Sequence, residues 1–277
     1  MYFIFYLFVF CFGLIIGSFL NVVIYRLEKD EDFVKGRSYC PHCKHQLTWP
    51  DLIPVVSFLF LQGKCRYCHT KISWQYPLVE IATGLIFLLI FNQLSTYQLI
   101  NLFFLFYIAS VLIVIFVYDL KFYLIPDKVL FPAIIIAFLY RLVFVIASGV
   151  FLNAPCGNLD CFASLAMTGA VLNYVLAAIL ASGFFLFLYL ISRGQWMGFG
   201  DVKLAILLGL LLGFPSILVG LFLSFFFGAI IGVVLLFFKK KGLKSEMPFA
   251  PFLIIGTLAA MFWGDKIINW YMRFLIF

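Results

Sequence analysis

Residues 103–119 read FFLFYIASVLIVIFVYD, an apolar run that ends in a single carboxylate, Asp119. Such a run forms a continuous helix in lipid, because a helix satisfies its backbone N–H and C=O groups internally. Similar runs recur along the 277-residue chain, which is 65% hydrophobic and only 11% charged. About 20 such residues cross a hydrocarbon core of about 30 Å. The sequence predicts an all-α polytopic membrane protein, because the runs lack the alternation of a lipid-embedded barrel.

We expect about eight transmembrane helices. Their approximate ranges are 2–25, 78–93, 98–119, 128–148, 165–191, 202–213, 216–238 and 249–264. Residues 265–277 either continue the eighth helix or form an interfacial tail. The chain then divides into a first helix at 1–25, a polar insert at 26–77 and a polytopic domain at 78–277. We expect the first helix to be retained, because no basic n-region or cleavage site accompanies it.

The basic residues predict the orientation in the membrane. Lysine and arginine gather in the insert and in alternate loops, whereas the loops near 94–97, 149–164 and 214–215 hold none. Loops rich in these residues stay in the cytoplasm. We therefore expect a bacterial inner-membrane protein with its N-terminus outside and its insert inside. The net charge of +7 then reflects cytoplasmic loops rather than nucleic-acid binding.

Two CxxC pairs lie in the insert, separated by 21 residues. They are Cys40 with Cys43 and Cys65 with Cys68. Two such knuckles complete a tetrahedral Cys₄ zinc site, and four protein ligands leave no open position, so the zinc is expected to be structural. The alternatives are a pair of redox dithiols, or a ligand taken from the neighbouring His42, His45 and His69.

A further cysteine pair, Cys156 and Cys161, lies in a loop that we expect outside the cytoplasm. Disulfides persist in oxidising compartments. The spacing alone does not fix the geometry. A short disulfide loop and two free thiols therefore both stay open.

Ionisable groups near the bilayer core are costly and mark functional candidates. In the membrane portion they are Glu80, Asp119, Asp127, Asp201 and Asp265. Asp119 ends a helix, where the dipole disfavours negative charge, and Asp201 begins one, where the dipole favours it. If the two meet, one is biased to be protonated and the other ionised, which divides acid and base roles. For Asp127, helix capping is the alternative. Glu80 could instead pair with a lysine or arginine of the insert, and Asp265 could form an ion pair with Lys266 or an interfacial anchor.

The stretch GFGDVKLA (198–205) surrounds Asp201. Gly198 and Gly200 allow a close backbone approach or a positive φ, so an extended peptide can reach the carboxylate. Lys203 marks the inner edge of the membrane. The alternative is a glycine-rich connection in which Asp201 only caps a helix, and the spacing does not choose between these readings.

Several stretches together resemble the bacterial type IV prepilin peptidases, a family of GxGD aspartyl proteases. They are GSFLNVVIYRL (17–27), the CxxC pairs, YPLVEIATG (76–84), YDLKFYLIPD (118–127) and GFGDVKLA (198–205). The resemblance implies that Asp119 and Asp201 are catalytic, with Asp127 as the alternative to Asp119. Gly198, Gly200 and Lys203 then form the catalytic loop.

The resemblance also implies the reaction. A prepilin or pseudopilin loses its basic leader after a glycine at the cytoplasmic face, and the new N-terminus is methylated with S-adenosylmethionine. Methyl transfer is associated with the first helix and the insert, so Glu80, Asn21 and Arg26 are candidate ligand-binding residues. The lipid bilayer and the prepilin are the expected partners, and nucleic acid is not.

Two other functions stay compatible with the sequence. One is a peptidase without methyltransferase activity, since no glycine-rich loop for S-adenosylmethionine is recognisable. The other is a zinc-braced membrane scaffold or transporter with its aspartates on an ion path. The peptidase hypothesis further predicts a bell-shaped pH profile that belongs to the aspartate pair.

Overall fold

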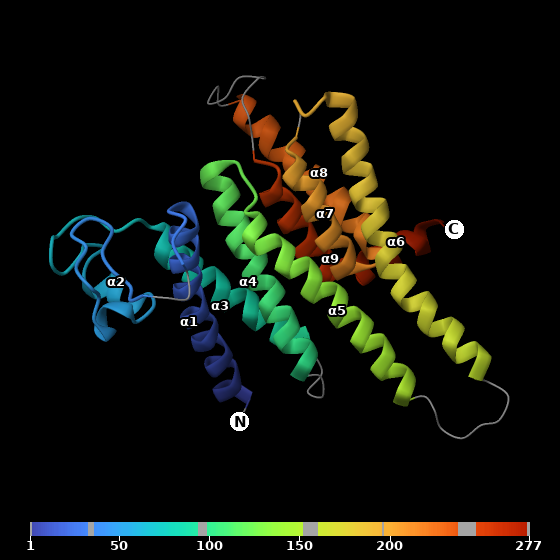
Figure 1. The fold of residues 1–277 in the computed structure, drawn as a ribbon, viewed down its shortest axis with the longest axis horizontal. Coiled ribbons are helices and arrows are strands. Elements are labelled where there is room, and N and C mark those ends of the chain that lie inside the picture. Colours follow the sequence, from blue (N-terminus) through green and yellow to red (C-terminus); the bar gives the residue numbers. More distant parts are fainter. Residues whose placement is uncertain are drawn as a thin grey trace. The chain divides into compact units, whose positions relative to one another are not determined.

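The computed structural model describes residues 2–32, 36–93, 99–151, 160–195, 197–237 and 248–275. Within these ranges the chain is helical and holds no β-strand (Figure 1). The long helices are α1 (Tyr2–Glu28), α3 (Gln75–Gln93), α4 (Leu99–Phe122), α5 (Asp127–Phe151), α6 (Asp160–Ser192), α7 (Phe199–Leu212), α8 (Ser216–Phe237) and α9 (Ala250–Leu275). The insert holds a 3₁₀ turn, η1 (Trp49–Leu52), and the short helix α2 (Val56–Phe60).

All eight predicted segments are helices, and most of their ends lie within a few residues of the predicted positions. The eighth continues to Leu275, which decides between the two readings of residues 265–277. In the described part of the chain six helices are long and apolar enough to cross a membrane: α1, α3, α4, α6, α8 and α9. The fourteen residues of α7 reach only about 21 Å at 1.5 Å per residue. The expectation of eight full spans is therefore wrong for α7, whose length suits a helix embedded in the protein.

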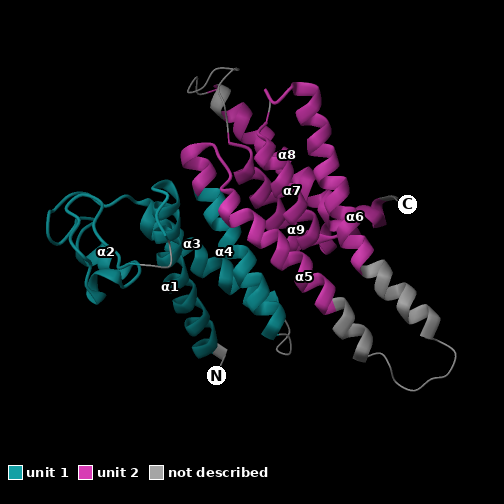
Figure 2. Ribbon diagram, viewed as in Figure 1, with its two compact units in different colours: residues 1–117 teal, residues 118–277 magenta. Residues whose placement is uncertain are grey.

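The chain divides into two compact units, residues 1–117 and 118–277, and the boundary falls inside α4 (Figure 2). In the first unit α1 packs along α3. A Cβ atom built on Gly13 would lie 2.7 Å from the Cα atom of Gly84, so these helices touch backbone to backbone. Small residues at such contacts allow helices to approach each other closely in lipid. The rings of Phe87 and Phe106 stack 4.0 Å apart in the core of this unit.

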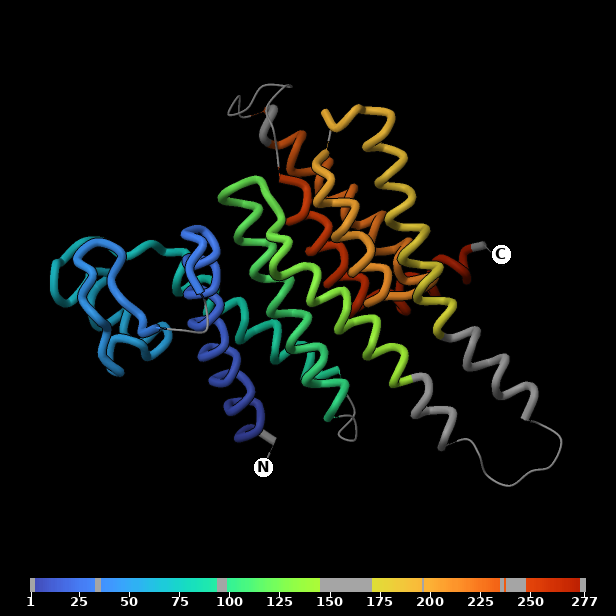
Figure 3. The backbone as a smooth tube through the Cα atoms, viewed as in Figure 1, coloured from blue at the N-terminus to red at the C-terminus, as the bar shows by residue number. Residues whose placement is uncertain are grey.

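In the second unit α7 is surrounded by other helices. It packs against α5, α6 and α9, and Figure 3 shows its trace passing among them. Gly209 of α7 meets the backbone of Ala178 so closely that no side chain would fit. Most of its residues from Asp201 to Leu211 are buried. A short helix enclosed in this way holds the residue at its first turn in a fixed place.

Candidate active site and metal centre

The structure brings Asp119 and Asp201 together within the second unit. Asp119 lies in the last turn of α4 and is 5% exposed, and Asp201 lies in the first turn of α7 and is 7% exposed. Their carboxylates are close enough to interact electrostatically. Two carboxylates that are withdrawn from water and interact electrostatically can share one proton.

Asp119 also contacts the first residue of α9. Its carboxylate accepts a hydrogen bond from the backbone N–H of Ala250, while its Oδ2 atom is buried without a hydrogen-bond partner. A buried polar atom without a partner is rare in native proteins, and it marks a place for a water molecule or a substrate group. Sequence reasoning missed Ala250. The available signal was Pro251 beside it, since proline favours the first turn of a helix.

Asp201 has a structural contact as well. Gly198 is the N-cap of α7, and the carboxylate of Asp201, three residues later, accepts a hydrogen bond from the Gly198 N–H. An acidic residue at this position commonly reaches back to the N-cap in this way. Asp201 therefore helps to cap the helix from its third position while Gly198 is the N-cap residue, and this contact coexists with the carboxylate pair.

The two glycines before Asp201 do not take up a positive φ, so that part of the expectation is wrong. Gly198 has a φ of −77°, and Gly200 is not among the positive-φ glycines of the described chain. A Cβ atom on Gly200 would lie 3.1–3.3 Å from the side chain of Ile125, so this glycine allows close packing. A Cβ atom on Gly198 would meet nothing closer than 3.9 Å, so that side of the loop is open.

Asp127 and Lys203 form an ion pair. The Lys203 Nζ atom donates to Asp127 Oδ1 at 2.9 Å and Oδ2 at 2.8 Å, and the Asp127 side chain is 52% exposed. The contact ties the start of α5 to α7. Asp127 is thus paired with Lys203 and exposed to solvent. This favours Asp119, rather than Asp127, as the catalytic partner of Asp201.

The four CxxC cysteines come together at one point in the insert. The Sγ atoms of Cys40, Cys43, Cys65 and Cys68 all lie within 4.8 Å of one another. The pair Cys40 and Cys68 is 3.8 Å apart, close to the separation of about 3.8 Å that follows from tetrahedral ligands at about 2.3 Å. The donor set and its spacing fit zinc.

The two knuckles repeat the same backbone pattern 25 residues apart. The Cys40 N–H donates to the His45 carbonyl, and the Cys65 N–H donates to the Thr70 carbonyl, both at 2.9 Å. The fourth residue after the first cysteine has a positive φ in each knuckle, 60° at Lys44 and 57° at His69. Two equal loops therefore each present a cysteine pair to one metal.

The environment of Cys68 favours its thiolate form. The Thr70 hydroxyl lies 3.0 Å from the Cys68 Sγ atom, and this hydrogen bond is the largest of the contacts that together lower the pKa of Cys68 to about 6. Thiolate is the form that binds metal. The ring of His45 stacks on Tyr67 at 3.7 Å, and the cluster is complete without a histidine. The predicted pair of Cys156 and Cys161 lies outside the residues whose side chains are described.

Glu80 and Asn21 are buried in the first unit, where α1 meets α3. Glu80 Oε2 accepts a hydrogen bond of 2.7 Å from the Val55 N–H of the insert. The expected lysine or arginine partner is therefore replaced by a backbone amide. Asn21 Nδ2 donates to the carbonyls of Gly17 and Tyr76. The Asn21 Oδ1 atom is buried without a partner.

Arg26 holds the chain segment that follows α1. The residue is 4% exposed, and its guanidinium donates to the backbone carbonyls of Asp32, Gly36 and Arg37. These contacts fold the chain back towards the end of the helix. They use donors that a ligand would otherwise take.

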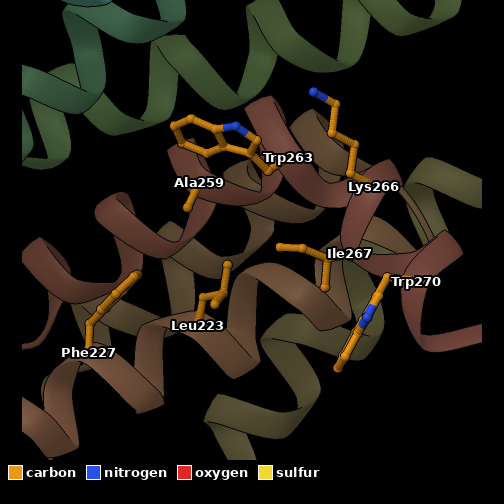
Figure 4. A pocket seen from close by; sticks show the side chains of 7 residues that line it. All are labelled: Leu223, Phe227, Ala259, Trp263, Lys266, Ile267 and Trp270. Carbon is orange, nitrogen blue, oxygen red and sulfur yellow. The ribbon is translucent and has the colours of Figure 1, made fainter. Parts of the chain in front are cut away.

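A groove of about 460 Å³ lies between α8 and α9, away from these residues (Figure 4). It is lined by Leu223, Phe227, Ala259, Trp263, Lys266, Ile267 and Trp270. None of these lining residues is a carboxylate or a cysteine, so they offer no group for hydrolysis or for metal binding. We place the candidate chemistry at the aspartate pair instead.

Known proteins resemble this chain along nearly its whole length. Residues 11–94 match the bacterial peptidase A24 N-terminal domain, and residues 105–233 match the type IV leader peptidase family. A protein of Aeromonas salmonicida named prepilin leader peptidase/N-methyltransferase is 33% identical, covering 97% of this chain and 94% of the relative. This chain belongs to the type IV leader peptidase family.

Two further relatives carry the same name. One from Bacillus subtilis is 31% identical over 95% of this chain and 96% of its own length. One from Legionella pneumophila is 33% identical over 97% of this chain and 95% of its own length. No solved structure matches the chain. The resemblance drawn from the motifs is thus confirmed, and the six long apolar helices among the described residues make the chain an integral membrane protein.

Proposed function

We propose that this member of the family removes the basic leader of a prepilin or pseudopilin after a glycine and methylates the new N-terminus. The names of its relatives support both activities. The observation that carries the peptidase assignment is the buried pair Asp119 and Asp201, in which Asp119 keeps one buried oxygen without a partner. An ion path or a scaffold would not require this pairing.

The pair suits the hydrolysis of a peptide bond. Two buried carboxylates cannot both carry charge at low cost, so they hold one proton between them. The ionised carboxylate takes a proton from a water molecule as its oxygen attacks the scissile carbonyl carbon, and the protonated one donates to the carbonyl oxygen. The leaving nitrogen is then protonated as the C–N bond breaks. The N–H groups of Ala250 and Gly198 hold the two carboxylates in orientation.

The position of the pair suits a membrane-anchored substrate. Asp119 lies at the C-terminal end of α4 and Asp201 at the N-terminal end of α7, with Lys121 and Lys203 beside them. By the positive-inside rule this end is cytoplasmic, and we assign the protein to the bacterial inner membrane. A prepilin with an apolar helix and a basic leader would present its scissile bond at this level.

S-adenosylmethionine is the methyl donor that we assign to the second reaction. Bound, it supplies an electrophilic methyl group on a positively charged sulfur. Asn21 and Glu80 fit such a cation, because the Asn21 Oδ1 atom is a buried acceptor without a partner and Glu80 adds a buried carboxylate. Arg26 would act by holding the loop beside them.

Mass spectrometry of a prepilin incubated with the purified protein tests this function. We expect the product to lack the leader under both conditions. We expect it to be one methyl group heavier only when S-adenosylmethionine is present. An intact prepilin under both conditions would refute the peptidase. A cleaved but unmethylated product in the presence of the donor would leave a peptidase alone.

A further inference from the structure

The insert exposes an unusual apolar segment. Residues 49–60 read WPDLIPVVSFLF, and six of these side chains are large, apolar and exposed. They are Trp49 (77%), Leu52 (41%), Ile53 (39%), Val56 (43%), Leu59 (65%) and Phe60 (84%). Six large apolar side chains exposed within twelve residues of a polar domain indicate an interaction site. We call this segment the apolar face of the insert.

The one ionisable side chain of the apolar face is buried. Asp51 is the one ionisable residue between 49 and 60, and its side chain is 4% exposed. Its carboxylate pairs with Arg66 at 2.9 Å and accepts a hydrogen bond from the Thr48 hydroxyl at 2.8 Å. The segment therefore exposes its apolar side chains and buries its carboxylate, which is the reverse of what a solvent-exposed protein surface usually does.

The apolar face is attached near the end of a membrane-spanning helix. The Val55 N–H bonds to Glu80, which lies five residues after Gln75, the start of α3. At 1.5 Å per residue this is about 7 Å along the helix. Val55 has a φ of 60°, which is strained for a β-branched residue, and the bond to Glu80 helps to hold it there. Trp74, which precedes α3, is 69% exposed and packs on Phe58 at 5.0 Å.

We propose that the apolar face docks on the phospholipid bilayer, with Trp49, Leu59 and Phe60 in the interfacial zone beside α3. Tryptophan prefers this zone, because one end of its ring is apolar and the other is polar. Residues 26–77 hold eight lysines and arginines against five acidic residues, which suits anionic headgroups. A bilayer already surrounds α3, so docking extends an existing contact with lipid.

Tryptophan fluorescence in lipid tests the proposal. A full-length variant with Trp74, Trp196, Trp263 and Trp270 changed to phenylalanine keeps Trp49 as its only tryptophan. In vesicles of brominated phosphatidylglycerol and phosphatidylcholine we expect the Trp49 emission to be blue-shifted and quenched. Bromine near the headgroups should quench more than bromine deep in the chains, because such faces insert only about 5–10 Å.

The docked face is tested by a variant and a matched control in the same background. Leu59→Ser with Phe60→Ser should lose most of the quenching, while Gln46→Ser, also exposed in the insert, should keep it. Retained zinc shows that each variant is folded. Emission that iodide in the buffer quenches fully, and brominated lipid does not, would overturn the proposal. Shielding from iodide that arises only when a prepilin is added would overturn it too, because the face would then bind protein. Neither result depends on cleavage activity.

Discussion

Asp201 serves two purposes, and substitutions can separate them. It accepts a hydrogen bond from the Gly198 N–H at the start of α7 and interacts electrostatically with the carboxylate of Asp119. Asparagine keeps an acceptor for the N–H but cannot act as an acid or base. We expect Asp201→Asn to melt close to the wild type and Asp201→Ala to lose about 0.5–2 kcal/mol, as helix-capping losses do. Thermal unfolding in detergent measures both. Equal melting of the alanine variant and the wild type would contradict the capping contact.

The ion pair of Asp127 and Lys203 should matter little for stability. Both side chains are partly exposed, and exposed pairs contribute about 0.2–1 kcal/mol. A double-mutant cycle with Asp127→Asn and Lys203→Met should give a coupling energy in this range, and Asp127→Asn should still cleave. Complete loss of cleavage by folded Asp127→Asn would move the catalytic role to Asp127.

Residues with distinctive chemistry were predictable from the sequence, and their backbone partners were not. The four cysteines and the pair Asp119 and Asp201 stand out against an apolar chain, so their grouping could be inferred. The N–H groups of Ala250 and Val55 carry no such mark, because any residue except proline supplies one. Only the folded chain shows that they meet Asp119 and Glu80.

At the scale of the element, α7 is held at both ends. Its last carbonyls, at Leu210 and Leu211, accept hydrogen bonds from the Arg141 guanidinium of α5. The guanidinium also lies 4.0 Å from the ring centre of Tyr174. A cation at this end complements the helix dipole, so Arg141 helps to fix the helix that carries Asp201.

The stability of Arg141 variants should depend on which interactions with α7 the new side chain retains. Arg141→Met leaves buried carbonyls without a donor, at a cost of about 1–3 kcal/mol each. Arg141→Lys keeps the charge but loses the forked geometry. We expect the melting temperature to fall in the order wild type, lysine variant, methionine variant. A methionine variant that melts with the wild type would show that the contact does not stabilise α7.

Helix positions were predictable, because long apolar runs have few alternatives in lipid, but helix roles were not. The sequence of 202–213 resembles one more membrane span. The packing of α5, α6 and α9 around it shows instead that this short helix is embedded in the protein. The sequence does not decide the C-terminal extension of α9, because Asp265 and Lys266 interrupt the apolar run without ending the helix.

At the scale of the whole molecule, the residues proposed for the two reactions belong to different compact units. The cysteine cluster, Asn21 and Glu80 belong to residues 1–117, and both aspartates belong to residues 118–277. We expect Cys40→Ser with Cys65→Ser to lose zinc and methyl transfer while keeping cleavage. Metal analysis and mass spectrometry of the product measure this. Stoichiometric zinc in the double variant would reject the Cys₄ site, and loss of cleavage in folded protein would reject the separation.

The central claim is that Asp119 and Asp201 act together on the peptide bond. The most direct measurement is the cleavage rate of a purified prepilin by Asp119→Asn and Asp201→Asn, with Asp127→Asn as the matched carboxylate control. The account predicts that each of the first two variants loses cleavage while melting close to the wild type, and that the control retains it. Full cleavage by folded Asp119→Asn or folded Asp201→Asn would contradict the account.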